Sequence, residues 1–392
     1  MPIAVRKLTI RRRTILCMMM LACAAIMVAI SPMLEQFQRE YGLTTIQQGT
    51  LLMFQFMGFT IFTLVGGIGA DYFSKKAMLI LSLSMVPAAL LILTFIHNFF
   101  VLLLGLFLIG GGLGILESLT VSMMSDIAQG DAALHINILQ AFFGIGALAF
   151  PILMAYVLGA GYSWKLLYQI SAIFYLLLLV FFWKTPYQES REKAAFSLED
   201  VRNLGKNGPF LVVCLCMFCY TGAEVGVWGW ITTYMKNVIG FSDLASNACL
   251  GLFWGMVVVG RLAVGFLSQR FPTSKIILFL SGISVVVTLG IAVATLEEMI
   301  WFSVFAMGLS YSAQWPTLVA YGSQLCDRSS GVVFAVLTAA GGVGMTVVPY
   351  VMGIISQYTN ERISMLLPVV LLLVIPIAIH TISKRSNERA GR

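Results

Sequence analysis

The sequence predicts an all-α integral membrane protein with twelve membrane-spanning helices arranged as two six-helix bundles. Three observations lead to this prediction. The composition is 59% hydrophobic and only 10% charged, whereas soluble domains carry about 25% charged residues. Apolar runs near 20 residues recur along the whole chain, and each is long enough to cross about 30 Å of hydrocarbon. Several local patterns also recur at a shift of about half the chain length.

Twelve apolar runs define the expected helices. The first is too long, and too weakly bounded by a small-residue cleavage site, to be a removed signal peptide, so we expect it to remain as a helix. In chain order the expected spans are 14–34, 47–70, 77–96, 99–124, 136–158, 164–183, 209–234, 244–268, 275–294, 299–321, 331–355 and 363–383.

The second half of the chain repeats patterns of the first half. Four local patterns recur at one offset of 198 residues: Gly144-Ile-Gly146 with Gly342-Val-Gly344, Pro151 with Pro349, Gly42 with Gly240, and Gly67 with Gly265. Because six is an even number, two six-helix halves share one orientation and are related by an axis along the membrane normal. We therefore expect an N-terminal bundle at 1–183, a cytoplasmic linker at 184–208 and a C-terminal bundle at 209–392, with a solute path between the bundles.

The distribution of basic residues predicts the orientation. With the N-terminus in the cytoplasm, 19 Lys and Arg residues fall inside and four outside, while Arg261 alone lies within a span. This positive-inside pattern places both termini of a multi-pass protein on the cytoplasmic side of the inner membrane. The net charge of +7 follows from this topology and does not indicate nucleic-acid binding. The basic segment from Arg6 to Arg13 is expected to contact lipid headgroups.

The sequence gives no sign of an enzyme. It contains no Gly-x-x-x-x-Gly-Lys-Ser/Thr, no His-Glu-x-x-His and no pair of intramembrane aspartates, which argues against ATP-driven transport and an embedded protease. A channel would need a selectivity filter or a ring of charged residues, and neither is visible in the sequence. Cys214 and Cys216 point in different directions on one helix, which is poor geometry for a shared metal ion, so we expect no metal site. We also expect no disulfide framework, no catalytic residue and no cofactor.

Two glutamates, Glu117 and Glu224, stand alone inside apolar runs. A carboxylate at bilayer depth costs roughly 2.5–3.5 kcal/mol on insertion scales, so such residues usually face a cavity and function there. We interpret both as cation-coupling groups, the alternative being structural anchors between helices. Sodium would need several converging oxygen ligands, whereas one titrating carboxylate suffices for a proton. We favour protons because helix 1 shows no second acid.

Polar and aromatic residues near these carboxyl groups are the candidates for solute binding. Tyr220 and Trp228 lie one turn to either side of Glu224, and aromatic rings can stack on the C–H faces of sugars. Gln314 lies near the counterpart of Glu117 in the repeat. Packing between helices and an aromatic belt at the membrane surface are the alternatives. The predicted solute-binding residues are Asn137, Gln140, Tyr220, Glu224, Trp228, Tyr311, Gln314 and Trp315.

The connection between the second and third expected spans reads Gly67-x-x-Ala-Asp71-x-x-x-Lys75-Lys76. It is similar to the loop motif between helices 2 and 3 of the major facilitator superfamily, which the chain resembles over essentially its full length. Tyr72 stands in place of the arginine of that motif and Ser74 in place of its second glycine. The second copy, Gly260-Arg261 before Gly265-x-x-x-Gln269-Arg270, lacks the acid. The resemblance implies the major facilitator fold and a cytoplasmic gate formed by Asp71, Lys75, Lys76, Arg261 and Arg270. For Arg261, snorkelling to the membrane surface is the alternative.

Two expected spans carry more specific patterns: Tyr220-x-Gly222-Ala-Glu224-x-x-x-x-x-Trp230-Ile-x-x-Tyr234 in 209–234 and Ile136-Asn137-x-x-Gln140-x-Phe142 in 136–158. These patterns resemble helix 7 and helix 5 of the fucose–proton symporters and sodium-dependent glucose transporters, a narrower group. Glu117 falls where fucose permeases carry a helix-4 carboxylate. Three polar positions of those permeases are occupied here by Ser31, Val121 and Phe143, so the first-half site is less polar.

Together these observations predict a secondary active transporter that couples symport of a small polar solute to protons. A sugar or related compound is the first choice, moved by rocking of one half against the other. Proton-coupled efflux of amphipathic compounds and a non-transporting sensor are the alternatives; Phe150 before Pro151 counts against efflux. The expected partners are the solute, a proton or sodium ion and membrane lipid, without nucleic acid, and the expected state is a monomer.

Overall fold

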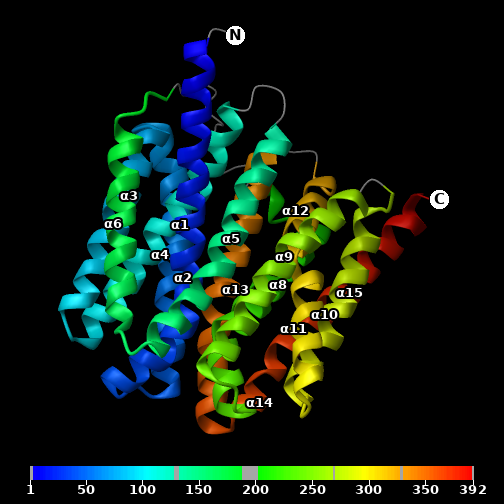
Figure 1. The fold of residues 1–392 in the computed structure, drawn as a ribbon. Coiled ribbons are helices and arrows are strands. Elements are labelled where there is room, and N and C mark those ends of the chain that lie inside the picture. The colour runs from blue at the N-terminus through cyan, green and yellow to red at the C-terminus, as the bar shows by residue number, and fades with distance from the viewer. Residues whose placement is uncertain (1–2, 128–131, 188–201, 268–269, 327–329, 391–392) are drawn as a thin grey trace. The chain divides into compact units, whose positions relative to one another are not determined.

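The computed structural model describes residues 3–127, 132–187, 202–267, 270–326 and 330–390, and the elements in these ranges are helical (Figure 1). The chain forms two compact units. The first comprises Met1–Thr44, Thr50–Lys193 and Ser242–Gly251, and the second comprises Thr45–Gly49, Ala194–Phe241 and Leu252–Arg392. Much of the expected linker, residues 188–201, lies outside the described ranges.

Six long helices build the first unit, and side-chain caps set several of their starts. Ser74 accepts from the backbone N–H of Ala77 at the start of α3, and Asn98 accepts from the N–H groups of Phe100 and Val101 at the start of α4. Such caps satisfy backbone donors that the first helical turn leaves free. The helices are α1 (Ile3–Tyr41), α2 (Thr45–Tyr72), α3 (Lys75–Phe95), α4 (Phe99–Ile127), α5 (Ala132–Gly159) and α6 (Trp164–Trp183).

The second unit begins with α8, whose first turn is capped by Asn207 and contains Pro209. The same Asn207 amide donates to the carbonyl of Leu325 at 3.0 Å. It therefore connects the start of α8 to the segment that follows α12. The elements from here to the end of the chain are α8 (Gly208–Tyr234), the π-helical turn η1 (Met235–Ile239), α9 (Asp243–Leu267), α10 (Thr273–Val293), α11 (Glu297–Tyr311), α12 (Gln314–Gln324), α13 (Ser330–Tyr358), α14 (Glu361–Ser364) and α15 (Leu366–Ala390). The first part of α9, up to Gly251, is grouped with the first unit.

The all-α membrane class expected from composition is confirmed, with one difference in the tenth span. Among the described residues, eleven helices have the length and apolar composition needed to cross a membrane. The span expected at 299–321 is instead divided into α11, of 15 residues, and α12, of 11 residues. Neither half is long enough to cross a bilayer alone. The break between them lies at Ser312 and Ala313.

Both units contain the same close helix contacts, which agrees with the repeat in the sequence. A Cβ atom at Gly110 of α4 would lie 1.8 Å from the carbonyl oxygen of Gln55 in α2. At Gly308 of α11 it would lie 2.4 Å from the carbonyl oxygen of Phe253 in α9. Only glycine allows backbones to approach this closely. A second matching pair joins Gly146 to Leu21 and Gly344 to Phe218, each at 2.2 Å.

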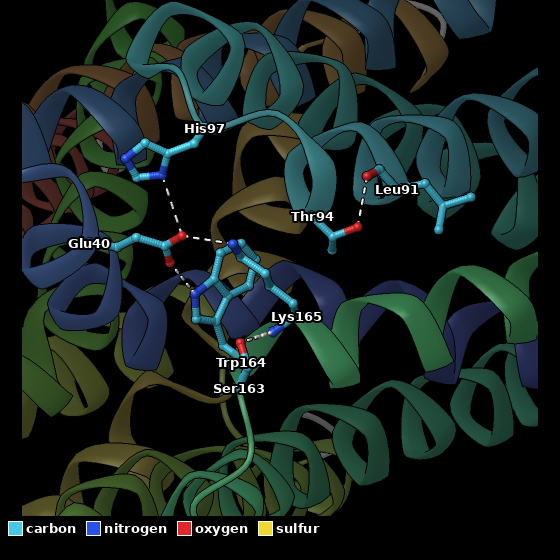
Figure 2. A network of polar contacts seen from close by, with 7 residues as sticks. All are labelled: Glu40, Leu91, Thr94, His97, Ser163, Trp164 and Lys165. Atoms are coloured by element: carbon cyan, nitrogen blue, oxygen red, sulfur yellow. Dashed lines mark hydrogen bonds and ion pairs between the residues drawn. The ribbon is translucent and has the colours of Figure 1, made fainter.

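A polar network at one end of the first unit joins α1, α6 and the connection between α3 and α4 (Figure 2). Glu40 accepts from Trp164 Nε1 at 2.7 Å and pairs with Lys165 Nζ at 2.8 Å and His97 Nδ1 at 3.4 Å. The second unit has a simpler contact, from Asn237 Nδ2 to Glu361 Oε1 at 3.0 Å. Glu40–Trp164 and Asn237–Glu361 each join residues 124 positions apart, so the repeat extends to these polar contacts.

Candidate functional site

The break between α11 and α12 lies deep in the second unit and exposes backbone groups that a continuous helix would pair. Pro316 has no N–H, so it cannot donate to the carbonyl of Ser312 four residues earlier. Buried carbonyl groups without a partner cost free energy, and inside a membrane no water replaces the lost donor. The carbonyls at the break therefore need other donors.

Four consecutive carbonyls at the break each receive a side-chain donor. Two of the donors, the Ser312 hydroxyl and the Gln314 amide, belong to the break itself. Tyr220 and Arg261 reach it from α8 and α9. The four hydrogen bonds are Ser312 Oγ to Leu309 O at 2.7 Å, Gln314 Nε2 to Ser310 O at 3.1 Å, the Tyr220 hydroxyl to Tyr311 O at 2.8 Å, and Arg261 Nε to Ser312 O at 3.1 Å. Side chains thus stabilise the break as a defined part of the fold.

Glu224 lies beside two of these donors. Its side chain is buried on α8, one turn after Tyr220, with the residue 8% exposed. The carboxyl is within hydrogen-bonding reach of the Tyr220 hydroxyl and interacts electrostatically with Arg261. Tyr220 has a single hydroxyl proton, and the structure directs it to the Tyr311 carbonyl. A hydrogen bond between Glu224 and Tyr220 in this arrangement therefore requires a protonated carboxyl as the donor.

Gln314 presents a free acceptor at the start of α12. It is fully buried, and Nε2 donates to Ser284 Oγ at 2.7 Å and to Ser310 O at 3.1 Å. Both amide hydrogens are thereby used. Its Oε1 atom is buried and has no hydrogen-bond partner in the part of the chain that the structure describes. Such an acceptor is suited to a group that brings its own hydrogen.

Aromatic rings connect the rest of the predicted second-half site. Trp228 packs against Trp254 with ring centres 5.9 Å apart, and Trp254 packs against Phe253 at 5.4 Å. Phe253 contacts Tyr311 at 5.9 Å, and Tyr311 contacts Tyr220 at 6.1 Å. Tyr311 also shares a hydrogen bond with Thr288 at 3.0 Å. Trp315, in contrast, packs against Phe334 of α13.

In the first unit, Glu117 is half-buried on α4 and interacts electrostatically with Cys23 of α1. The Cys23 thiol is 3.6 Å from the carbonyl oxygen of Leu113 in α4 and donates to it. The Tyr175 hydroxyl and the Thr120 hydroxyl are both buried, and neither has a hydrogen-bond partner within the described ranges. On α5, a predicted solute-binding pair differs in exposure: Asn137 is exposed and Gln140 is half-buried. Glu117 thus has a polar setting of its own.

The residues predicted to form a gate occupy three different settings. Lys75 pairs with Asp126 at the end of α4, with Nζ and Oδ2 2.6 Å apart. Lys76 donates to the carbonyls of Trp183 and Thr185, both at 3.0 Å, and so caps the end of α6. Asp71 and Arg270 are exposed, and Arg261 lies at the helix break.

Sequence reasoning missed four polar residues that complete these settings: Asp126, Ser284, Ser310 and Ser312. The serines had no signal beyond their presence in apolar runs. The proline at 316 was a usable signal for the break, because a proline inside a helix frees the carbonyl four residues earlier.

Comparison with known proteins identifies the family of this chain and several similar transporters. Residues 14–349 match the model of the Major Facilitator Superfamily. The glucose/mannose transporter GlcP of Bacillus subtilis is 24% identical over 335 residues, which cover 82% of this chain and 81% of GlcP. A solved structure of the Escherichia coli fucose:proton symporter FucP aligns with a TM-score of 0.65 and 20% identity over 94% of this chain and 98% of FucP. The nucleoside transporter NupG aligns with a TM-score of 0.78 and 14% identity over 95% and 99%.

Proposed function

This chain belongs to the Major Facilitator Superfamily and is a multi-pass membrane transporter, not an enzyme, and on that premise we propose that it carries a sugar or similar uncharged polar solute together with protons. Transport proceeds by alternating access across the inner membrane, with both termini in the cytoplasm, and the working unit is a monomer. The observation that carries the proposal is the buried Glu224, whose carboxyl must be protonated if it is to donate to Tyr220 while Tyr220 donates to the Tyr311 carbonyl.

Arg261 supports protons over sodium as the coupling ion at Glu224. A guanidinium is permanently charged, and it interacts electrostatically with this carboxyl. A second cation next to Glu224 would be repelled, and in a region of low dielectric constant that repulsion is large. A proton removes the carboxylate charge and adds no new ion.

The character of the solute follows from the free acceptor and the aromatic rings. Gln314 Oε1 can accept a hydrogen bond from the solute, whereas both hydrogens on Nε2 are already used within the protein. Hydroxyl groups satisfy such an acceptor, whereas a carboxylate or phosphate brings only further acceptors. Tyr220, Trp228, Tyr311 and Trp315 supply apolar faces for the carbon skeleton of a sugar. GlcP is a glucose/mannose transporter and FucP a fucose:proton symporter, which favours a sugar of this kind, and the nucleoside transporter NupG extends the choice to nucleosides.

The first unit supplies the second part of the proposal. Glu117 is proposed as a further proton-coupling group, because it is a half-buried carboxyl in a unit that also buries two hydroxyls without a hydrogen-bond partner among the described residues, Thr120 on its own helix and Tyr175 on α6. Asn137 and Gln140 of α5 are proposed to bind the solute. Asp71, Lys75, Lys76, Arg261 and Arg270 are retained as the proposed gate, with Lys75 and Lys76 acting through Asp126 and the end of α6.

Uptake into reconstituted vesicles tests the proposal. Purified full-length protein is given glucose, mannose, fucose and a nucleoside under a proton gradient or a sodium gradient. We expect proton-driven accumulation of at least one of these solutes. Glu224→Gln should abolish accumulation but retain exchange of solute across the membrane, because the amide imitates the protonated state. Glu298→Gln is the matched control, since it removes an exposed carboxylate at the start of α11.

Each other outcome contradicts a stated part of the proposal. Accumulation driven only by sodium contradicts the choice of ion. Proton-driven export of amphipathic compounds, or solute binding without flux, would favour the efflux or sensor alternatives. Absence of gradient-driven uptake for every solute in the panel contradicts the symport proposal as a whole.

A further inference from the structure

We propose that Glu224 acts on the half-helix α12 through two positioning residues, Tyr220 and Arg261, so that loss of its proton loosens the clamp on the α11–α12 break. The inference rests on the proposed function, because it takes Glu224 as the group that binds and releases the coupling proton. What it adds is a physical route from that proton to a moving element of the fold.

Tyr220 is shared between Glu224 and the break. With Glu224 neutral, the carboxyl donates to the Tyr220 oxygen, and the Tyr220 proton remains on the Tyr311 carbonyl at 2.8 Å. A carboxylate can only accept. Hydrogen bonds to an ionised acceptor are roughly twice as strong as neutral ones. The Tyr220 proton therefore turns toward the charged Glu224, and the Tyr311 carbonyl loses its donor.

Arg261 is shared in the same way. Its Nε donates to the Ser312 carbonyl at 3.1 Å, and its guanidinium interacts electrostatically with Glu224. The neighbouring Gly260 is in close contact with the break, since a Cβ atom there would lie 2.3 Å from Ser312 Oγ. A negative charge on Glu224 draws the guanidinium away from the carbonyl. Pro316 has no N–H with which to replace it.

Few other ionisable groups are available to change the charge around Glu224 and Arg261. Tyr311 of α11 is the further titratable group that interacts with Glu224. The sequences of α12 and α13 contain no Asp, Glu, Lys, Arg or His. On the other elements of this part of the chain, the remaining Asp, Glu, Lys, Arg and His residues with described side chains lie near element ends: Lys236 in η1, Asp243 in α9, Lys275 in α10, Glu297 and Glu298 in α11, Glu361 and Arg362 in α14, and His380 toward the end of the described side chains of α15. The other tyrosines and cysteines on α9 to α15 are Cys249 in α9, Tyr321 in α12, and Tyr350 and Tyr358 in α13.

The consequence is a link between the proton and the proposed solute site. When Tyr220 and Arg261 leave the break, Ser312 Oγ and Gln314 Nε2 are the side-chain donors that remain, among the described residues, for the carbonyls of residues 309–312. The start of α12 then keeps the hydrogen bond from Gln314 to Ser284 of α10 but has lost both donors from α8 and α9. Gln314, which carries the free acceptor, is the first residue of α12. Release of the proton thus loosens the residue proposed to bind the solute.

Hydrogen exchange in the full-length protein, without solute, tests the inference. Exchange of backbone amides in 314–324 is measured from pH 5 to pH 9, with labelling times scaled for the intrinsic pH dependence. In the wild type we expect protection of α12 to fall roughly tenfold as Glu224 loses its proton, the size expected from losing one or two hydrogen bonds. Glu224→Gln should hold α12 protected at every pH. Tyr220→Phe and Arg261→Gln should reduce protection at every pH.

Ser312→Ala is the matched control. It removes a donor to the same break that is hydrogen-bonded to Leu309 and is not among the groups interacting electrostatically with Glu224, so it should reduce protection but retain the pH response. The inference is overturned if wild-type α12 shows the same pH-independent protection as Glu224→Gln, or if Ser312→Ala abolishes the response. The comparison of wild type with Glu224→Gln decides the matter even if another variant does not fold. Loss of proton-driven uptake in Glu224→Gln without a pH response in α12 refutes only this inference, whereas a pH response without any uptake refutes only the proposed function.

Discussion

Replacing Gly308 by alanine tests whether the close approach of α9 and α11 maintains the helix break. The added Cβ would lie 2.4 Å from the Phe253 carbonyl oxygen and 2.6 Å from Met256 Cβ. Ordinary contacts begin near 3.4 Å, so the two helices must separate locally by about 1 Å, because packed interiors have little free space. The obstacle is largely backbone and cannot move aside as a flexible side chain would.

This separation has a calculable effect on Arg261, because its hydrogen bond joins the same two helices. The distance from Arg261 Nε to the Ser312 carbonyl is 3.1 Å, and an extra 1 Å or so takes it outside hydrogen-bonding range. Overpacking costs about 1–3 kcal/mol. Leaving the buried Ser312 carbonyl unpaired costs about 1–3 kcal/mol more. We expect Gly308→Ala to lower the free energy of unfolding by an amount within that combined range.

Thermal unfolding of the full-length protein in detergent, followed by tryptophan fluorescence, measures the effect. Gly282→Ala in α10 is the matched control, because a Cβ atom at Gly282 meets nothing within 4 Å. Glycine to alanine at an unhindered helical site stabilises by about 0.4–1 kcal/mol, so the control should melt at or slightly above the wild-type temperature. A Gly308→Ala protein that melts no lower than Gly282→Ala would refute the reasoning.

Two further predictions concern the first unit. Ser74 has φ 136° and ψ 153°, a region that costs other residues than glycine about 1–3 kcal/mol; Ser74→Gly should therefore raise the melting temperature even though it loses the cap on Ala77, while Ser74→Ala should lower it. Glu40→Gln should keep an acceptor for Trp164 and lose the charge that attracts Lys165. Because these ionic groups are partly exposed, the loss should stay below about 1 kcal/mol and shrink in 1 M salt; a larger or salt-independent loss would contradict this assignment.

Much of the candidate site could be predicted because it is local. Tyr220 and Glu224 are one helical turn apart, so their proximity follows from helix geometry. The cost of burying a carboxyl in an apolar span singled out Glu224 without any structural knowledge. Gln314 was recognised through the repeat, as the neutral counterpart of Glu117. In each case a single helix, or the duplication of one, was sufficient.

The partners of the charged residues could not be predicted, because they come from distant parts of the chain. Arg261 binds a backbone carbonyl 51 residues away, and no side-chain pattern marks a carbonyl as free. Lys75 pairs with Asp126, also 51 residues away, although the motif groups it with Asp71. Ser284 and Ser310 are engaged by Gln314, yet serine is common in apolar helices.

The sequence by itself determined that this protein is built from apolar helices in two related halves, because a membrane span must satisfy its backbone internally and bury few charges. It also determined where the two isolated carboxyl groups lie along those helices. Only the tertiary structure decided that one helix is broken at Ser312 and Ala313, and which side chains satisfy the carbonyls released there. The physical reason is that contacts between helices depend on their rotation and distance, which hydrophobic periodicity does not specify.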